Sequence, residues 1–188
     1  MPDPVTLRGP RVTLRPWRLP EDLDPLFAIN GDAQAMRHFL NVMDRAESDA
    51  WAARIAGLFG DHGYGFWPVD LPGEGLVGVV GIQPIMFEAA FAPGHEIGWR
   101  IATRAQRRGL AEEAARLALA HAFGPAGLPR IHAWTPPGNE PSWRLMEKLG
   151  MRRVGIFDHP RIPEGHPIRP HLLYVIERED WIADRLGT

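Results

Sequence analysis

The chain has 188 residues with no cysteine, and its 21 Lys and Arg nearly balance 23 Asp and Glu. This length favours a single domain over residues 1–188. The composition excludes disulfides, thiolate metal sites and a cysteine nucleophile, and the balanced charge argues against broad nucleic-acid binding. No apolar run approaches the ~18 residues of a membrane span, and the first residues lack the apolar core of a signal peptide. We therefore expect a cytoplasmic protein that binds neither membrane nor nucleic acid.

The N-terminal part of the sequence predicts one strand and two helices. Residues 11–17 alternate apolar and polar side chains, which indicates a strand. Residues 20–29 begin with proline and acidic residues, which favour a helix start. Residues 48–59 have apolar side chains at helical spacing. Residues 36–41 fit a helical turn or a loop equally well.

A hairpin is predicted next, from strands at 64–69 and 76–85 joined by a Pro/Gly turn. Gly75, Gly78 and Gly81 superficially suggest a dinucleotide-binding loop. Their spacing differs from that fingerprint and they lie inside a strand pattern. We therefore interpret them as small residues where a helix crosses the sheet.

The C-terminal half predicts alternating strands and helices. In order they are a strand at 95–101, a helix to 123, a strand at 130–135, a helix at 139–149 and strands at 152–157 and 172–177. The strand–helix–strand unit implies a parallel pair with a right-handed crossover, whereas the hairpins imply antiparallel pairs. The predicted class is α/β, with a central mixed, mostly antiparallel sheet of about seven strands and about four helices on its faces.

A basic turn, Gln106 to Ala111, leads into the Ala-rich helix. A helix that opens this way presents unpaired N–H groups and its positive dipole end, which fit a pyrophosphate. Gly109 permits close backbone approach, and Arg107 and Arg108 add charge. The alternative is a plain helix start with two solvated arginines. A P-loop is excluded because its Lys-Ser/Thr pair is missing.

Four motifs occur along this order of elements: Arg11 to Pro16, Glu96-Ile97-Gly98-Trp99, Gln106-x-x-Gly109-x-Ala111, and Asn139-x-x-Ser142 followed by Glu147 to Met151. Together with the order of elements, they resemble the GCN5-related N-acetyltransferase (GNAT) superfamily, and within it the RimJ/RimL-like group that acetylates ribosomal-protein N-termini. Two departures are Thr103, where these proteins often carry proline, and the bulky Trp143 beside Ser142.

The resemblance implies the GNAT fold, acetyl-CoA as co-substrate and an amine acceptor. It also implies that the strand at 95–101 splays from the strand at 130–135. The cofactor-binding residues it implies are Trp99, Arg100, Ile101, Gln106, Arg107, Arg108, Gly109, Leu110, Ala111, Asn139 and Ser142. The acceptor is a primary amine, either a protein N-terminus or a small molecule such as an antibiotic. A non-catalytic CoA-binding sensor is the other alternative, and a homodimer is left open.

Acetyl transfer to an amine needs a base and a proton for the leaving thiolate. Glu96 is the candidate base, since apolar neighbours would raise the pKa of its carboxyl. Its alternative is a structural pair with an arginine such as Arg15. Ser142 is the candidate acid, and its alternative is helix capping. Asn139 suits both a helix N-cap and a bond to the cofactor. With no cysteine, direct attack in a ternary complex is expected.

The segment 158–171 is rich in proline, histidine and arginine. Its histidines lack the spacing of a metal site, as does His95-Glu96, because Trp99 stands where the second histidine would be. We therefore expect no metal. Substrate contact, a dimer interface and a proline-stiffened connection all remain open for the segment. The tryptophans are expected mostly in the core, with Trp67, Trp99 and Trp134 placed to line an acceptor cleft.

Overall fold

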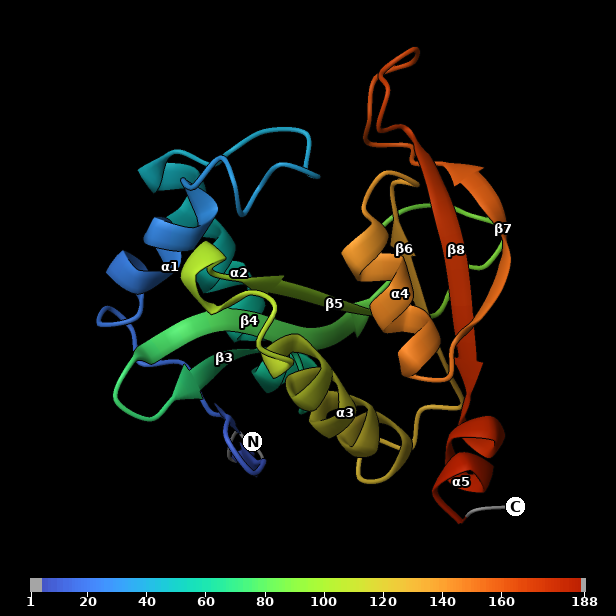
Figure 1. Ribbon diagram of the computed structural model, residues 1–188, viewed down its shortest axis with the longest axis horizontal. Helices are drawn as coiled ribbons and strands as arrows, with labels where there is room; N and C mark the ends of the chain where they lie inside the picture. The colour runs from blue at the N-terminus through green and yellow to red at the C-terminus, as the bar shows by residue number, and fades with distance from the viewer. Residues whose placement is uncertain (1–4, 187–188) are drawn as a thin grey trace.

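The computed structural model describes residues 5–186 and is organised around one eight-stranded mixed sheet, in the order β1-β2-β3-β4-β5-β6-β8-β7 (Figure 1). The strands are β1 (Leu7–Arg8), β2 (Thr13–Leu14), β3 (Phe66–Leu71), β4 (Gly75–Pro84), β5 (His95–Ile101), β6 (Arg130–Thr135), β7 (Arg152–Asp158) and β8 (Pro170–Glu177). Every pair is antiparallel except β5 and β6. The predicted class is confirmed, with eight strands in place of about seven.

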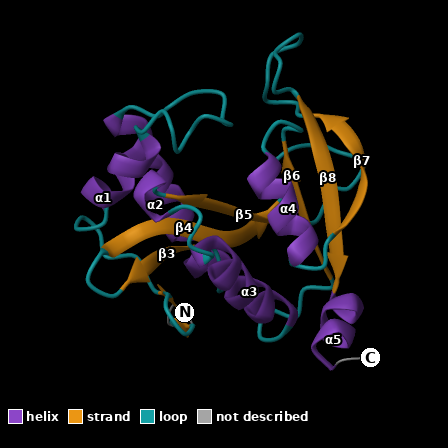
Figure 2. Cartoon of the chain, viewed as in Figure 1, coloured by secondary structure: helices purple, strands orange, loops and turns teal. Residues whose placement is uncertain are grey.

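The described chain also has five α-helices and one 3-10 turn (Figure 2). They are α1 (Leu23–Asn30), α2 (Arg45–His62), η1 (Thr103–Ala105), α3 (Leu110–Phe123), α4 (Glu140–Lys148) and α5 (Arg178–Leu186). Sequence patterns missed α5, which follows β8 with no breaker between them, and β1, which has only two residues. Residues 36–41 form an irregular loop. Within residues 5–186, no helix combines the length and apolarity needed to cross a membrane.

Helix α2 begins three residues earlier than its apolar pattern predicted, because a capping box fixes its start. The Asp44 carboxylate accepts a hydrogen bond of 2.8 Å from the Glu47 N–H. The Glu47 carboxylate accepts one of 2.9 Å from the Asp44 N–H. Two N–H groups that a helix start leaves unpaired are thereby satisfied. The spacing of apolar residues alone does not reveal this polar first turn of the helix.

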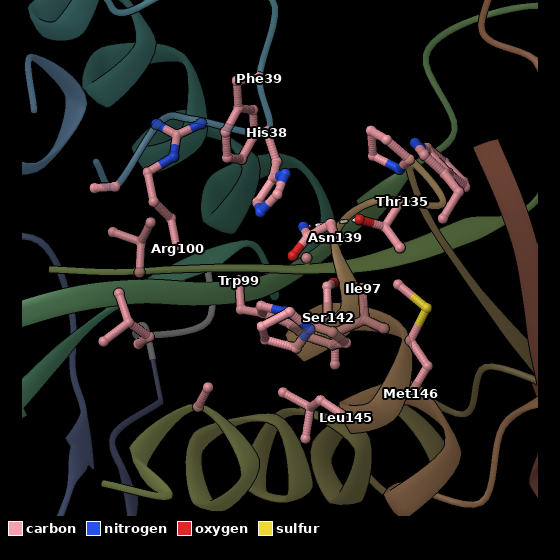
Figure 3. Close-up of a pocket in the computed structure, with 18 of the residues that line it drawn as sticks. His38, Phe39, Ile97, Trp99, Arg100, Thr135, Asn139, Ser142, Leu145 and Met146 are labelled. Carbon is pink, nitrogen blue, oxygen red and sulfur yellow. Dashed lines mark hydrogen bonds between the residues drawn. The ribbon is translucent and has the colours of Figure 1, made fainter. Parts of the chain in front are cut away.

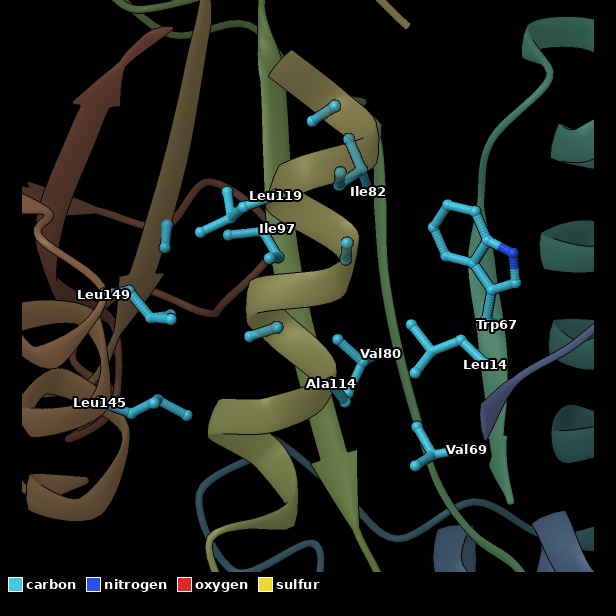
Figure 4. Close-up of a cluster of buried hydrophobic side chains, with 14 of the residues drawn as sticks. Leu14, Trp67, Val69, Val80, Ile82, Ile97, Ala114, Leu119, Leu145 and Leu149 are labelled. Carbon is cyan, nitrogen blue, oxygen red and sulfur yellow. The ribbon is translucent and has the colours of Figure 1, made fainter. Parts of the chain in front are cut away.

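Helices cover both faces of the β3–β5 region. On one face, Val79 packs with Leu26 of α1 and Ala52 of α2. On the other, α3 crosses β4 and β5 (Figure 4). The side of α3 that faces the sheet is built from small, fully buried side chains: Ala114, Ala115, Ala118 and Ala122. These alanines let the helix axis lie close to the strands, which fixes the position of the turn before α3.

Strands β5 and β6 separate soon after they meet. In the described sheet they pair at a single register point, Glu96 opposite His132, whereas β4 and β5 pair over seven positions. In Figure 1 β5 runs nearly across the view while β6 climbs away from it. The expected splay is confirmed, and it leaves the rest of the β5 edge without a strand partner on that side.

Gly81 marks a close approach between neighbouring strands. A Cβ atom added to it would lie 2.1 Å from the Gly65 carbonyl oxygen and 2.3 Å from the Phe66 Cα. Both contacts are with backbone, so no side-chain adjustment could relieve them. The strand interpretation of this Gly-containing segment is confirmed. Its expected reason was wrong, because the crowding comes from the adjacent strand and not from a crossing helix.

Candidate active site

The separation of β5 and β6 opens a cleft of about 840 Å³. Its walls are β5, the start of α3, β6 with α4, and the loop between α1 and α2 (Figure 3). Trp99 and Arg100 point to opposite faces of β5 in this view. The cleft therefore has two sides. One meets α3 and α4, and the other meets α1 and α2.

The turn before α3 is shaped to receive an anion. Arg107 and Gly109 both adopt positive φ, 60° and 75°, and Gly109 is the residue that precedes the helix. The first helical turn leaves its N–H groups without intrahelical acceptors, and they open toward the cleft. Leu110 and Ala111 line the cleft beside Arg107. Gln106 closes the turn, since its Nε2 donates a 3.0 Å hydrogen bond to the Ile101 carbonyl.

Arg11 braces this turn from the N-terminal segment. Its Nη1 donates a 2.7 Å hydrogen bond to the Arg108 carbonyl, across 97 positions of sequence. Its Nε donates another of 2.7 Å to Glu113 in the first turns of α3. The second Glu113 oxygen accepts from the N–H groups of Arg11 and Val12. Sequence patterns placed Arg11 only on a strand, so this supporting role is a structural finding.

The two arginines of the turn have different surroundings. Arg107 lines the cleft. Arg108 instead forms an ion pair of 2.9 Å with Glu74, the residue that also binds Arg104. Arg107 is therefore the one of the two arginines that lines the cleft, whereas the Arg108 side chain pairs with Glu74 beside it.

Asn139 and Ser142 lie together at the start of α4 and both line the cleft. The Asn139 side chain donates a 2.9 Å hydrogen bond to the Thr135 hydroxyl and does not cap the helix. This anchors the start of α4 to the end of β6. The Ser142 N–H donates to the Asn139 carbonyl, and its hydroxyl forms no hydrogen bond within residues 5–186. That hydroxyl is therefore free to act on a bound molecule.

Glu96 lies on the α1/α2 side of the cleft. Burial raises the pKa of its carboxyl to about 7, although a hydrogen bond from Gln83 and the charges of Arg161 and Arg54 oppose the rise. A carboxyl with this pKa exchanges a proton near neutral pH, as a general base must. The alternative partner, Arg15, binds Asp22 and Asp70 instead. Glu96 therefore has no buried structural ion pair.

The side chain of Arg100 makes contacts that the sequence did not suggest. Its guanidinium carbon lies 4.5 Å from the Phe39 ring centroid and 4.7 Å from that of Trp51. Its Nη1 donates to the Asn30 side-chain oxygen. The sequence suggested a backbone role for this residue, but its side chain is buried and directed toward the α1–α2 loop (Figure 3).

The tryptophans divide between the core and the cleft. Trp99 and Trp134 line the cleft, as expected. Trp67 does not, because it is fully buried and donates its indole N–H to the Val5 carbonyl at 2.9 Å. Trp51, expected in the core, lines the cleft from α2. The alternation of apolar and polar residues along a strand predicts which face of the sheet a side chain lies on. It does not predict whether other elements bury that face.

The segment 158–171 is packed against the protein near its two ends and is mostly exposed between them. His159 and His171 pack with Phe87 and Phe157 in an aromatic cluster, where burial lowers the pKa of His159 to about 4. Arg161 reaches the cleft and donates to the Met86 carbonyl. No group of three or more potential metal ligands occurs among residues 5–186. His159 and His171 thus pack in the aromatic cluster and also line the cleft.

Sequence patterns missed several residues of the α1/α2 side. His38, Phe39 and Arg54 line the cleft with Trp51 and Arg161. The first two lie in the 36–41 loop, where no periodicity identifies a face. An aromatic pair in an irregular, polar segment was the available signal. Figure 3 shows both rings directed into the cleft.

Comparison with known proteins gives consistent matches. Residues 11–152 match the family model described as "Acetyltransferase (GNAT) domain". The chain is 41% identical over 87 residues to the Bacillus subtilis (strain 168) protein "Uncharacterized N-acetyltransferase YnaD", an alignment that covers 46% of this chain and 51% of that protein. The chain thus aligns with about half the length of this curated relative.

Solved structures match over nearly the whole chain. An acetyltransferase of the GNAT family from Bacillus anthracis is 29% identical, with a TM-score of 0.77 and coverage of 93% of this chain and 99% of that one. Mycobacterium smegmatis RimJ in complex with CoA-disulfide is 26% identical, with a TM-score of 0.71 and coverage of 97% and 96%. The chain therefore shares its overall fold with these proteins.

Proposed function

Because the chain belongs to the GNAT acetyltransferase family, we propose that it transfers the acetyl group of acetyl-CoA directly to a primary amine in a ternary complex. One observation carries this proposal. The open start of α3, the unpaired edge of β5 and the half-buried carboxyl of Glu96 all border the same cleft. This arrangement combines an anion site with a base of suitable pKa.

The residues present fit acetyl-CoA. The N–H groups at the start of α3 and the Arg107 guanidinium suit the pyrophosphate. The backbone edge from Trp99 to Ile101 has no strand partner on this side, although the Ile101 carbonyl accepts from Gln106, and it suits the pantetheine arm, which carries amide groups that need partners. Asn139 and Ser142 face this edge from α4. The RimJ structure named above contains a CoA disulfide, which supports the same ligand class here.

Glu96 acts as the base in the proposed reaction. An attacking amine must lose its proton, and a carboxylate with a pKa near 7 accepts that proton at neutral pH, directly or through a water. Bound acetyl-CoA supplies the activated acetyl group. The chain has no cysteine, so no acyl-cysteine intermediate is available to it.

Ser142 supplies the proton or hydrogen bond that the departing thiolate requires. Its hydroxyl faces the cleft from the first turn of α4 and has no partner in the described part of the chain. The positive end of the α4 dipole, which also points into this region, stabilises developing negative charge. The base and the acid thus come from β5 and α4, on the two sides of the splayed strands.

The resemblance to the RimJ/RimL-like group supports a protein N-terminal amine as the acceptor. A small-molecule amine is the second acceptor class, and the long cleft accommodates either. The 36–41 loop and Arg161 of the 158–171 segment border the acceptor side. Loop segments of this kind commonly carry binding residues, so both contribute to the choice of acceptor.

The proposal is tested by thiol release from acetyl-CoA in the presence of an amine panel, with the N-acetylated product counted by mass spectrometry. We expect release that depends on an amine and equals the acetylated product. Tight CoA binding with no release for any amine would contradict the enzyme and favour a CoA-binding sensor. Release without an amine at the same rate would show hydrolysis instead of transfer.

A further inference from the structure

Arg100 is a buried cation without a counter-ion. Its side chain belongs to a residue that is 8% exposed. No carboxylate contacts it within residues 5–186, and its Nε has no hydrogen-bond partner there. Nη1 is used by the Asn30 amide oxygen, whereas Nη2 forms no hydrogen bond with the described residues. The guanidinium therefore retains donor capacity on a cleft-lining residue.

An uncompensated buried charge is costly, and the surroundings of Arg100 offset only part of that cost. The rings of Phe39 and Trp51 both provide cation–π contacts to it. Burial lowers the pKa of the guanidinium to about 10, so the group stays charged at neutral pH. A buried cation is well stabilised by an opposite charge with matching hydrogen-bond geometry. A carboxylate on a bound molecule would complete this site.

Two further cleft-lining guanidiniums lie near enough to Glu96 for their charges to act on it. Arg54 comes from α2 and Arg161 from the 158–171 segment, and both are exposed cleft-lining residues whose charges act on Glu96. Glu96 is the one carboxylate among the described residues lining this side. Glu112, the other lining carboxylate, lies in the first turn of α3 and pairs with Arg116. The acceptor side thus carries an excess of positive charge.

We propose that the acceptor amine also carries a carboxylate, and that Arg100 binds it while Arg54 and Arg161 attract it. This inference rests on the proposed function. Glu96 and Arg100 lie four residues apart on one face of β5, so their Cα atoms are separated by about 13 Å. The spacing suits an acidic side chain near a peptide N-terminus better than the α-carboxylate of a free amino acid. Polycationic amines are disfavoured by the same charges.

The test uses two pairs of acceptors that differ only in a carboxylate. They are Ala-Glu-amide against Ala-Gln-amide, and alanine against alaninamide. We expect wild-type kcat/KM to favour Ala-Glu-amide by about 10-fold or more, the effect of one charge-assisted hydrogen bond. Added salt should reduce this preference, since two of the three arginines are exposed. A preference within the alanine pair instead would identify the α-carboxylate as the group bound.

Variants assign the preference to Arg100. Arg100→Met keeps most of the apolar stem and should abolish the preference through KM, with CoA affinity unchanged. Arg100→Lys should restore part of it. Arg153→Met, on the exposed edge strand β7, is the matched control and should keep the full preference. If Arg100→Met instead lowered kcat/KM equally for Ala-Glu-amide and Ala-Gln-amide, the role of Arg100 would be purely structural and the proposal would be overturned.

The wild-type comparison needs no variant, so it decides the matter even if Arg100→Met does not fold. Equal kcat/KM within both pairs would overturn the inference and leave the proposed function intact. Absence of thiol release with all four amines would contradict the proposed function. In that case, calorimetry of CoA-loaded protein with N-acetylated Ala-Glu-amide and Ala-Gln-amide still tests the carboxylate site. Tighter binding of the acidic ligand would support the site, and equal or absent binding would refute it.

Discussion

Gln83 Nε2 donates a hydrogen bond of 2.7 Å to Glu96 Oε1, from β4 to the neighbouring strand β5. The Gln83 oxygen in turn accepts a 3.2 Å hydrogen bond from Arg54 Nη1. Gln83 therefore orients the carboxyl and favours its charged form, against the burial that raises its pKa. The pKa of the candidate base reflects a balance between these two effects.

Replacing Gln83 should shift the pH dependence of acetyl transfer. In Gln83→Leu the charged form of Glu96 loses a hydrogen bond, so its pKa rises further. Since the base must be deprotonated, we expect the midpoint of the kcat/KM profile to move up by about one pH unit. Gln34→Leu, on an exposed loop residue, is the control. A midpoint that stays in place or moves down would show that Gln83 does not stabilise the carboxylate.

Ser142→Ala should slow transfer without weakening CoA binding. Loss of a positioned acid lowers kcat by about 10²-fold. The Ser142 hydroxyl makes no hydrogen bond within the described residues, so its removal should change the free energy of unfolding little. Steady-state kinetics and CoA titration separate the two effects. Unchanged kcat, or a loss confined to thermal stability, would assign Ser142 to the helix start alone.

Arg11→Ala should weaken CoA binding although Arg11 does not line the cleft. The side chain holds the Arg108 carbonyl and the Glu113 carboxylate, and its loss frees the turn before α3. Because the Arg11 side chain is half exposed, we expect only a 3- to 10-fold increase in the Kd for CoA, or about 1 kcal/mol. Arg8→Ala provides the control on the adjacent strand. An unchanged Kd would show that the turn keeps its shape unaided.

His159 should make stability depend on pH in the acidic range. Burial lowers the pKa of His159 from its usual 6.5 to about 4. Between these values the unfolded chain binds more protons than the folded one, so stability falls as pH drops from 6.5 to 4. His159→Phe keeps a ring in the aromatic cluster and should reduce this fall by about 1–3 kcal/mol. Urea unfolding from pH 4 to 7 measures the slope.

The control for this measurement is His62→Phe, at an exposed histidine that ends α2. It should leave the pH slope of stability in place. An equal slope in wild type and His159→Phe would contradict the assignment, because the buried imidazole would then contribute no differential protonation. The same experiment distinguishes a packed segment from a flexible connection at 158–171.

Local patterns predicted the sheet and α3 well, because both follow from short-range chemistry. Alternation located the β5 and β6 segments. The basic turn from Gln106 to Ala111 predicted that a helix follows it, and α3 begins at Leu110. The bounds of α2 were missed because a capping box, not apolar spacing, begins that helix. The splay of β5 from β6 depends on packing between distant segments, so only family resemblance suggested it.

The sequence predicted the part of the candidate site that would bind acetyl-CoA, but not the part that would bind the acceptor amine. Residues from Gln106 to Ala111 form one contiguous motif, so the sequence alone identified them. Arg100 was assigned a backbone role, because nothing local reveals that Phe39 and Trp51 flank its side chain. Arg108 was placed beside the ligand because its partner Glu74 lies 34 positions away. Long-range pairs of this kind are outside the reach of motif reasoning.

The most direct test of the account is the pH profile of Glu96→Gln. Wild-type kcat/KM should rise with pH and level off above about 7, where the Glu96 carboxylate predominates. Glu96→Gln should reduce kcat/KM by about 10²-fold or more at neutral pH and remove this inflection, with an unchanged Kd for CoA. Glu88→Gln, at an exposed carboxyl, is the control. Full activity of Glu96→Gln at neutral pH, with the wild-type profile, would contradict the assignment of Glu96 as the base.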